Sequence, residues 1–212
     1  MKTSELIDSL VVDLTPRGLS LTSRFWLALG AGTLVSAVLF TIGVGPRADF
    51  AAAMHTLRFD LKFVDTLALA LPTALLCVRL MRPDARAGTL ALFLVAPFLF
   101  LGVAVAAELF LVPSAMWGTK MIGINSLHCL TLVPLLSIAP LFALIYAMRS
   151  GAPQHPTLSG ALAGAAAAGI AATLYATNCP DDSPLFVATW YPLATLIVVG
   201  VGAVAGHRLL RW

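Results

Sequence analysis

Two cysteines and a histidine carry the strongest capacity for metal or redox chemistry in this sequence. His128 and Cys129 precede a run of about twenty apolar residues, and Cys179 lies in a short polar stretch with Asp181 and Asp182. Thiolate and imidazole groups suit zinc and related soft ions. A disulfide and two unrelated structural thiols are alternative uses of the same residues, and the spacing leaves these alternatives open.

Few other residues have the pattern of a chemical site. Glu108 is the one acid embedded in an apolar run, and embedded acids are functional candidates. It lies near one end of its run, where we expect it to reach the interface or to pair with Lys120, and Asp65 begins another run. The sequence has no Gly-x-Ser-x-Gly, His-Glu-x-x-His or Walker motif, so we expect neither an enzyme nor a resident cofactor.

The composition identifies the class of protein. Hydrophobic residues make up 59% of the 212 residues and charged residues only 11%, whereas soluble domains carry roughly 25% charged residues. The chain therefore lacks the polar surface to cover itself in water, and we predict an integral membrane protein embedded in lipid. No block of five or six basic residues is present, which argues against direct binding of nucleic acid.

Six apolar segments are long enough to cross a bilayer, which requires about 20 helical residues. They cover about 25–44, 63–81, 88–112, 125–146, 158–176 and 185–206. We therefore predict an all-α, polytopic membrane protein with a bundle of six transmembrane helices over residues 23–212. Residues 47–62 mix charges with apolar residues on one helical face and predict an interfacial helix.

The distribution of positive charge predicts the orientation. Nine lysines and arginines lie on the side of the two termini and four on the opposite side. The nine lie within residues 2–24, 79–86, 149 and 208–211. Because positive charge is retained in the cytoplasm, we expect both termini to be cytoplasmic. Cys129 and Cys179 then lie on the periplasmic side, more than about 20 Å from Cys77 at a helical rise of 1.5 Å per residue.

Residues 1–22 form a polar N-terminal segment. An apolar face recurs with helical spacing, with acidic and hydroxyl side chains on the other face. The apolar face consists of Leu6, Ile7, Leu10, Val11 and Leu14. Two uses are open: packing against the membrane domain, or docking into the groove of a cytosolic partner.

Small residues recur at four-residue spacing in the last two apolar segments, as Gly160, Gly164 and Ala168 and as Gly202 and Gly206. Such ladders let helix backbones approach closely in lipid. We expect them to pack helices within the bundle, and a homodimer face is the less favoured use.

The stretch Cys129–Leu144, the run His155–Ala161 and the stretch Tyr175–Tyr191 resemble the six-span membrane anti-sigma factors of the NrsF type. The resemblance implies a protein that holds an extracytoplasmic-function sigma factor at the inner membrane through its cytoplasmic N-terminal segment. It further implies that Cys129 and Cys179 sense heavy-metal or oxidative stress. The position of His128 beside Cys129, and not the resemblance, suggests that the imidazole would join the two thiols in capturing a metal ion transiently.

Two functions from other classes compete with this interpretation. A small transporter or channel would use Glu108 and the helices interrupted by proline residues, although the two halves of the chain show no internal repeat. A thiol oxidoreductase would normally use a vicinal cysteine pair, and the three cysteines of this chain form no such pair.

Overall fold

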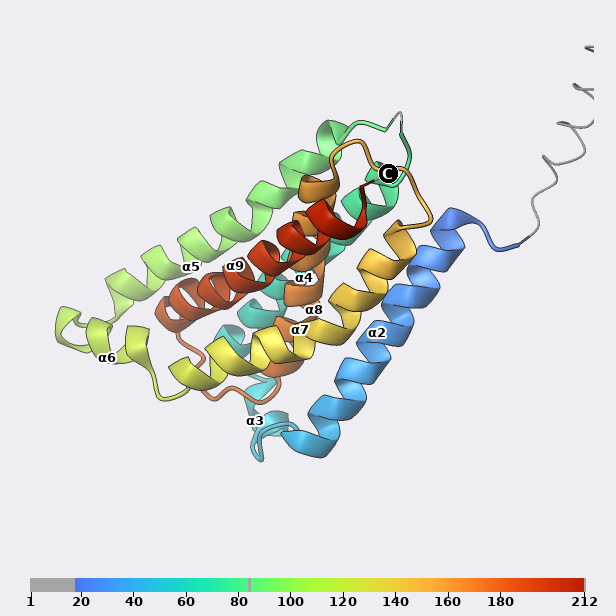
Figure 1. Cartoon of the computed structure of the whole chain (residues 1–212). Coiled ribbons are helices and arrows are strands. Elements are labelled where there is room, and N and C mark those ends of the chain that lie inside the picture. Colours follow the sequence, from blue (N-terminus) through green and yellow to red (C-terminus); the bar gives the residue numbers. More distant parts are fainter. Residues whose placement is uncertain (1–17, 84, 212) are drawn as a thin grey trace, which may run out of the picture.

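The computed structural model describes residues 18–83 and 85–211, and in this part of the chain the regular structure is entirely helical. Figure 1 shows the helices in a single bundle. In chain order they are α2 Leu21–Gly43, α3 Phe50–Ala53, α4 Leu57–Leu80, η1 Gly88–Val95, α5 Ala96–Leu111, η2 Ser114–Met116, α6 Trp117–Ile122, α7 Ser126–Met148, α8 Pro156–Ala176 and α9 Pro184–Leu209. The predicted apolar face of residues 6–14 lies outside the described residues.

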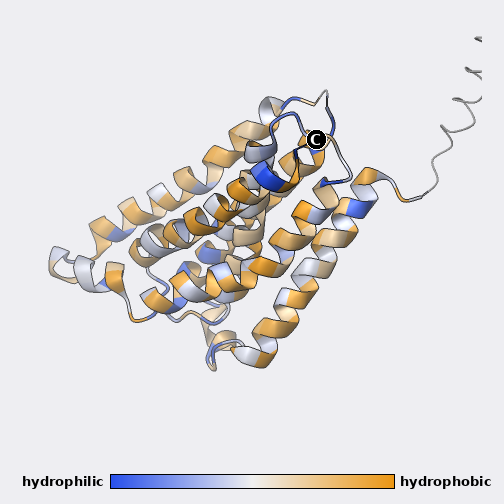
Figure 2. Cartoon of the chain, in the orientation of Figure 1, coloured by the Kyte–Doolittle hydropathy of each residue, from blue (hydrophilic) through white to orange (hydrophobic). Residues whose placement is uncertain are grey.

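Six helical segments are long and apolar enough to cross a membrane: 21–43, 57–80, 88–111, 114–148, 156–176 and 184–209. Hydrophobic residues cover these segments along their length, whereas hydrophilic residues concentrate in the loops and at the helix ends (Figure 2). The start of α2 and the C-terminus lie at the same end of the bundle (Figure 1). The prediction of an all-α, multi-pass membrane protein with six spans is confirmed.

Helix α8 forms the centre of the bundle. Most of its residues are buried, and it packs against α4, α7 and α9. Helices α2 and α5 lie at opposite edges (Figure 1), and α5 buries only Pro97 and Glu108. The wide apolar surface of α5 therefore suits contact with lipid chains.

The glycine ladders join α8 to α9. A Cβ atom at Gly160 would lie close to the carbonyl oxygen of Gly202, and one at Gly206 would lie close to that of Pro156. Only glycine permits this backbone approach, so the prediction that these residues pack helices within the bundle is confirmed.

Proline residues inside the spans leave carbonyl groups without their usual helical donors. Pro140 in α7 cannot donate to the carbonyl of Leu136, and the hydroxyl of Ser36 in α2 donates to that carbonyl instead, at 2.6 Å. Gly32 allows the approach of α2, because a Cβ there would lie 2.7 Å from the Cα of Pro140. One polar contact in the apolar layer thus fixes α2 against α7.

The predicted interfacial helix over residues 47–62 is wrong. Helix α3 is a single turn, and the chain is extended at Thr56, with φ −110° and ψ 129°, before α4 begins at Leu57. Arg58 and Lys62 therefore belong to the first turns of a spanning helix, six residues earlier than the predicted start. The membrane domain accepts these charges because acidic groups from other elements neutralise them.

The buried side chains form two apolar clusters, one toward each end of the bundle. Cys77 belongs to the cluster that includes Phe25 and Met148. Cys129 and Cys179 both belong to the other cluster, with Tyr175 and Phe186. The fold thus separates Cys77 from the other two cysteines, as the predicted topology requires.

Candidate functional site

The candidate site is built around residues 177–183, the loop that joins α8 to α9. The N–H of Cys179 donates to the carbonyl of Tyr175 at 3.0 Å, which extends the end of α8. Pro180 and Pro184 flank the two aspartates, and Pro184 starts α9. The loop consequently presents the carbonyl of Cys179 and the side chains of Asp181 and Asp182 to neighbouring elements.

Lys62 of α4 reaches this loop from inside the bundle. Its side chain is only 1% exposed, its ammonium lies 2.5 Å from Oδ1 of Asp182, and it donates to the carbonyl of Cys179 at 2.8 Å. A buried ammonium requires such partners, because removing an isolated charge from water is strongly unfavourable. Lys62 therefore ties α4 directly to the residue that carries one of the two candidate thiols.

Arg47, in the segment between α2 and α3, binds the same loop from the other side. Its guanidinium lies 2.9 Å from Asp182 and 2.6 Å from Asp49. Its hydrogen bond to the exposed Asp49 holds the pKa of that carboxyl below its usual value. The backbone N–H of Arg47 also donates to the carbonyl of Thr177 at 3.1 Å.

Asn178 adds a further contact between the loop and the end of α2, because its amide donates to the carbonyl of Gly45 at 2.8 Å. The contacts of Lys62, Arg47 and Asn178 together join the α8–α9 loop to both α2 and α4.

Asp181 holds the start of α7. Its Oδ2 accepts hydrogen bonds from the backbone N–H groups of Ile124 and Asn125, at 3.0 and 2.9 Å. Gly123 makes this approach possible, because its φ of +59° favours glycine and a Cβ there would lie 2.8 Å from the Asp181 carboxylate. The loop carrying Cys179 therefore also positions the first turn of α7, where Cys129 lies.

The expected pairing of Glu108 with Lys120 is wrong. Glu108 is buried, its Oε2 accepts a hydrogen bond from Arg58 at 2.7 Å, and its Oε1 accepts one from the hydroxyl of Ser183 at 3.2 Å. The acid embedded in α5 is thus paired with a cation of α4 and hydrogen-bonded to the same interhelical loop. Its partners give Glu108 a structural role and do not favour a transport pathway.

Cys129 and Cys179 are both free and fully buried. The thiol of Cys179 faces the carbonyl of Asp181 at 3.9 Å, and the hydroxyl of Tyr175 donates to the carbonyl of Asn125 at 3.3 Å. Burial raises the pKa of the Cys179 thiol above its usual value, while the nearby Lys62 opposes that rise. The closed arrangement therefore favours the neutral thiol, the form that reacts slowly with oxidants and metals.

His128 does not join the two thiols. It precedes Cys129 on α7, and its side chain is exposed while Cys129 is buried. The described residues contain no group of three histidine, cysteine or acidic side chains close enough to hold one ion. In this arrangement Cys129 and Cys179 lie in the same buried apolar cluster, whereas His128 lies outside it.

The roles of Lys62 and Arg47 are not predicted from the sequence. In the sequence both residues contribute only positive charge to the side opposite the termini, yet in the structure they supply the ion pairs that hold the cysteine-bearing loop. One sequence feature could have indicated these ion pairs. Two adjacent aspartates lie in one loop, and cations lie at the edge of an apolar run on the same side of the predicted membrane.

These features define a class: a multi-pass α-helical membrane protein with two buried thiols at one end, where the α8–α9 loop is held by ion pairs to α4 and to the segment between α2 and α3.

The chain belongs to the family described as negative regulator of sigma F, whose family model matches residues 10–212. It is 29% identical over the full length of both chains to a probable anti-sigma-F factor NrsF of Azospira oryzae. It is 32% identical, again over the full length of both, to the anti-sigma-F factor NrsF of Caulobacter vibrioides. No solved structure matches the chain.

Proposed function

We propose that this protein is an anti-sigma factor of the bacterial inner membrane that sequesters an extracytoplasmic-function sigma factor on the cytoplasmic side. Residues 1–22 bind the sigma factor through the face formed by Leu6, Ile7, Leu10, Val11 and Leu14. Heavy-metal or oxidative stress at Cys129 and Cys179 releases it. Membership of the family and the full-length similarity to two anti-sigma-F factors support the regulatory role.

The observation that carries the sensing proposal is the placement of both thiols in one buried cluster beneath the loop 177–183. Oxidation by hydrogen peroxide would join the two sulfur atoms, with two electrons and two protons passing to the peroxide to form two water molecules. A thiophilic ion such as Cd²⁺ would instead displace the two thiol protons and bind both thiolates. Either product differs in shape and charge from two packed thiols.

The loop contacts offer a route from the thiols to the sigma-binding segment. Arg47 and Asn178 hold the loop against the outer end of α2, and the other end of α2 continues into residues 1–20. A signal can shift an equilibrium only when it favours one of two states. In this proposal the released state is the one in which the loop no longer packs on α2 and α4.

The sensing test uses the intact protein with its sigma factor in detergent or liposomes. A Cys129→Ser, Cys179→Ser variant should retain the sigma factor but fail to release it on addition of Cd²⁺ or hydrogen peroxide. Cys77→Ser is the matched control, because Cys77 lies in the other cluster, and it should release normally. Normal release by the double variant would refute the sensing proposal.

The binding test compares two glutamate substitutions on neighbouring positions of the N-terminal segment. Leu10→Glu places a charge on the apolar face and should abolish retention of the sigma factor. Ser9→Glu places the same charge on the polar face and should leave retention intact. Equal retention by the two variants would show that this face is not the binding surface.

A further inference from the structure

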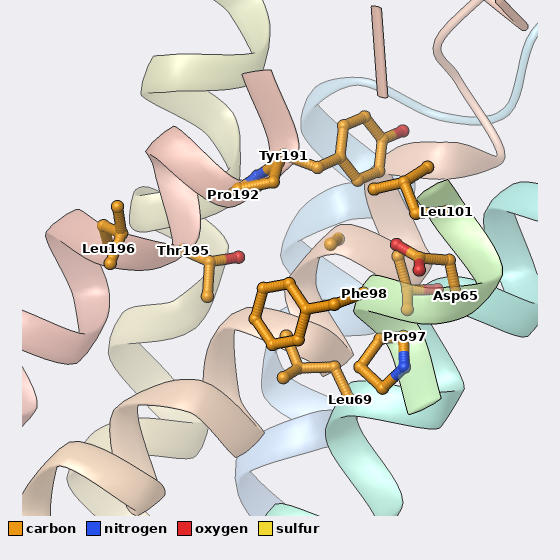
Figure 3. A pocket seen from close by; sticks show the side chains of 11 residues that line it. Asp65, Leu69, Pro97, Phe98, Leu101, Tyr191, Pro192, Thr195 and Leu196 are labelled. Atoms are coloured by element: carbon orange, nitrogen blue, oxygen red, sulfur yellow. The ribbon is translucent and has the colours of Figure 1, made fainter. Parts of the chain in front are cut away.

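A cavity of about 150 Å³ lies between α4, α5 and α9 (Figure 3). Apolar side chains line most of it, among them Leu69, Phe98 and Leu101. An apolar cavity of this size holds a benzene-sized molecule. Phe98 and Leu196 at its rim are 67% and 64% exposed, so the cavity faces the lipid phase of the membrane.

One wall of the cavity carries a buried carboxylate. Asp65 of α4 is 9% exposed, and its Oδ1 has no hydrogen-bond partner among residues 18–83 and 85–211. Figure 3 shows this carboxylate pointing into the cavity, near Leu101. A buried acceptor without a donor is unfavourable, and each such group in a native protein calls for an explanation.

The nearest cations on the same helix are already engaged. Lys62, one turn before Asp65, binds Asp182 and the carbonyl of Cys179. Arg58, one turn further away, binds Glu108. The first turns of α4 therefore provide Asp65 with no counter-charge. The hydroxyl of Tyr191 lines the same cavity and also has no hydrogen-bond partner among the described residues, so it does not satisfy Asp65 in this arrangement. A donor from outside the chain would satisfy the carboxylate.

We propose that this cavity binds a compact lipophilic molecule that carries one hydrogen-bond donor, an amine or a hydroxyl group. The donor binds the carboxylate of Asp65, and a ring or short alkyl group of about the size of benzene fills the apolar space. The molecule enters from the bilayer between Phe98 and Leu196. This site is separate from the sigma-binding segment, and the inference does not depend on the proposed function.

The test uses the full-length protein in liposomes and a benzylamine that carries a photoreactive diazirine. Adducts mapped by mass spectrometry should concentrate on the segments of α4, α5 and α9 around Asp65. Benzylamine or benzyl alcohol should compete at concentrations at least about tenfold below those required for toluene, which has the same ring without a donor. Comparison of the amine with the alcohol shows which donor the carboxylate prefers.

Three variants make the result decisive. Asp65→Leu should abolish the preference for the donor-bearing competitors, and Thr195→Trp should fill the cavity and abolish the adducts. Asp60→Leu, which removes an exposed acid from the same helix, should leave both results unchanged. Equal competition by toluene in the unmodified protein, or unchanged adducts in Thr195→Trp, would overturn the proposal.

Discussion

Replacing Lys62 with methionine tests whether the ion pairs at this end of the bundle hold the cysteine-bearing loop. Breaking a buried ion pair costs about 3–5 kcal/mol, and the lost hydrogen bond to a carbonyl adds about 1–3 kcal/mol. Asp182 is 22% exposed and keeps its pairing with Arg47, which reduces the cost. We expect Lys62→Met to lower the free energy of unfolding by about 2–4 kcal/mol, because methionine fills the same space without the charge.

Two measurements check this expectation on the purified protein. Unfolding in mixed micelles gives the change in stability, and the rate of maleimide labelling gives the exposure of Cys179. If the opening that exposes the thiol also breaks the Lys62 pair, labelling should accelerate by about 30- to 700-fold, since 1.4 kcal/mol corresponds to a tenfold change in population.

Lys120→Met is the matched control for this experiment. Lys120 lies at the same end of the bundle and forms none of the ion pairs found among the described residues. Its replacement should change stability by no more than about 0.5 kcal/mol, as surface substitutions usually do. Indistinguishable stabilities and labelling rates for the two methionine variants would refute the role assigned to Lys62.

Three further predictions address the packing, the second ion pair and the thiol. Gly202→Ala should destabilise the bundle by about 1–3 kcal/mol through overpacking. Gly200→Ala should be neutral or stabilising by up to about 1 kcal/mol, because a Cβ at Gly200 meets nothing within 4 Å. Unfolding of the two variants in mixed micelles measures the difference. Arg58→Met should cost about 3 kcal/mol because it leaves the buried Glu108 charge unpaired, and Glu108→Gln should cost less because Arg58 is 44% exposed; the reverse order in unfolding would contradict this assignment. Burial raises the pKa of Cys179 in the folded protein. The contribution of the buried thiol to the free energy of unfolding should therefore be complete below the usual thiol pKa of about 8.5 and decline as pH rises through the higher pKa of the folded state. Stability measured against pH for the unmodified protein and for Cys179→Ser tests this pH dependence.

The six spans were predictable because apolar runs of about 20 residues have few alternatives to membrane helices. The start of α4 was not predictable from hydropathy, because hydropathy treats Arg58 and Lys62 as unfavourable in a span. It does not include the acids of α5 and of the α8–α9 loop that pair with these two cations. Those acids come from residues 108 and 182, at separations of 50 and 120 positions from their partners. Glycine spacing predicted close helix packing within the bundle, and the structure shows that the packed pair is α8 and α9.

The site was predictable only in part for the same reason. Cysteines at the same end of two spans indicated a shared compartment, and the structure places both in one apolar cluster. The orientation of His128 depends on the rotation of α7, which places Cys129 inward and its neighbour outward. The carboxylate of Asp65 was visible in the sequence, but the cavity it faces depends on the packing of three helices.

Two opposing effects act on the protonation of the Cys179 thiol in the closed loop. Burial favours the neutral thiol, and the ammonium of Lys62 favours the thiolate. While the loop is closed, burial is the larger effect and favours the neutral thiol, the form that reacts slowly with oxidants. Admission of water weakens the effect of burial first, so an opening that leaves Lys62 near the sulfur would lower the thiol pKa and increase its reactivity. The lysine that stabilises the closed state would thereby also activate the thiol in a partly open state. Under the sensing proposal, one buried cation would then serve both the retention of the loop and the response to an oxidant.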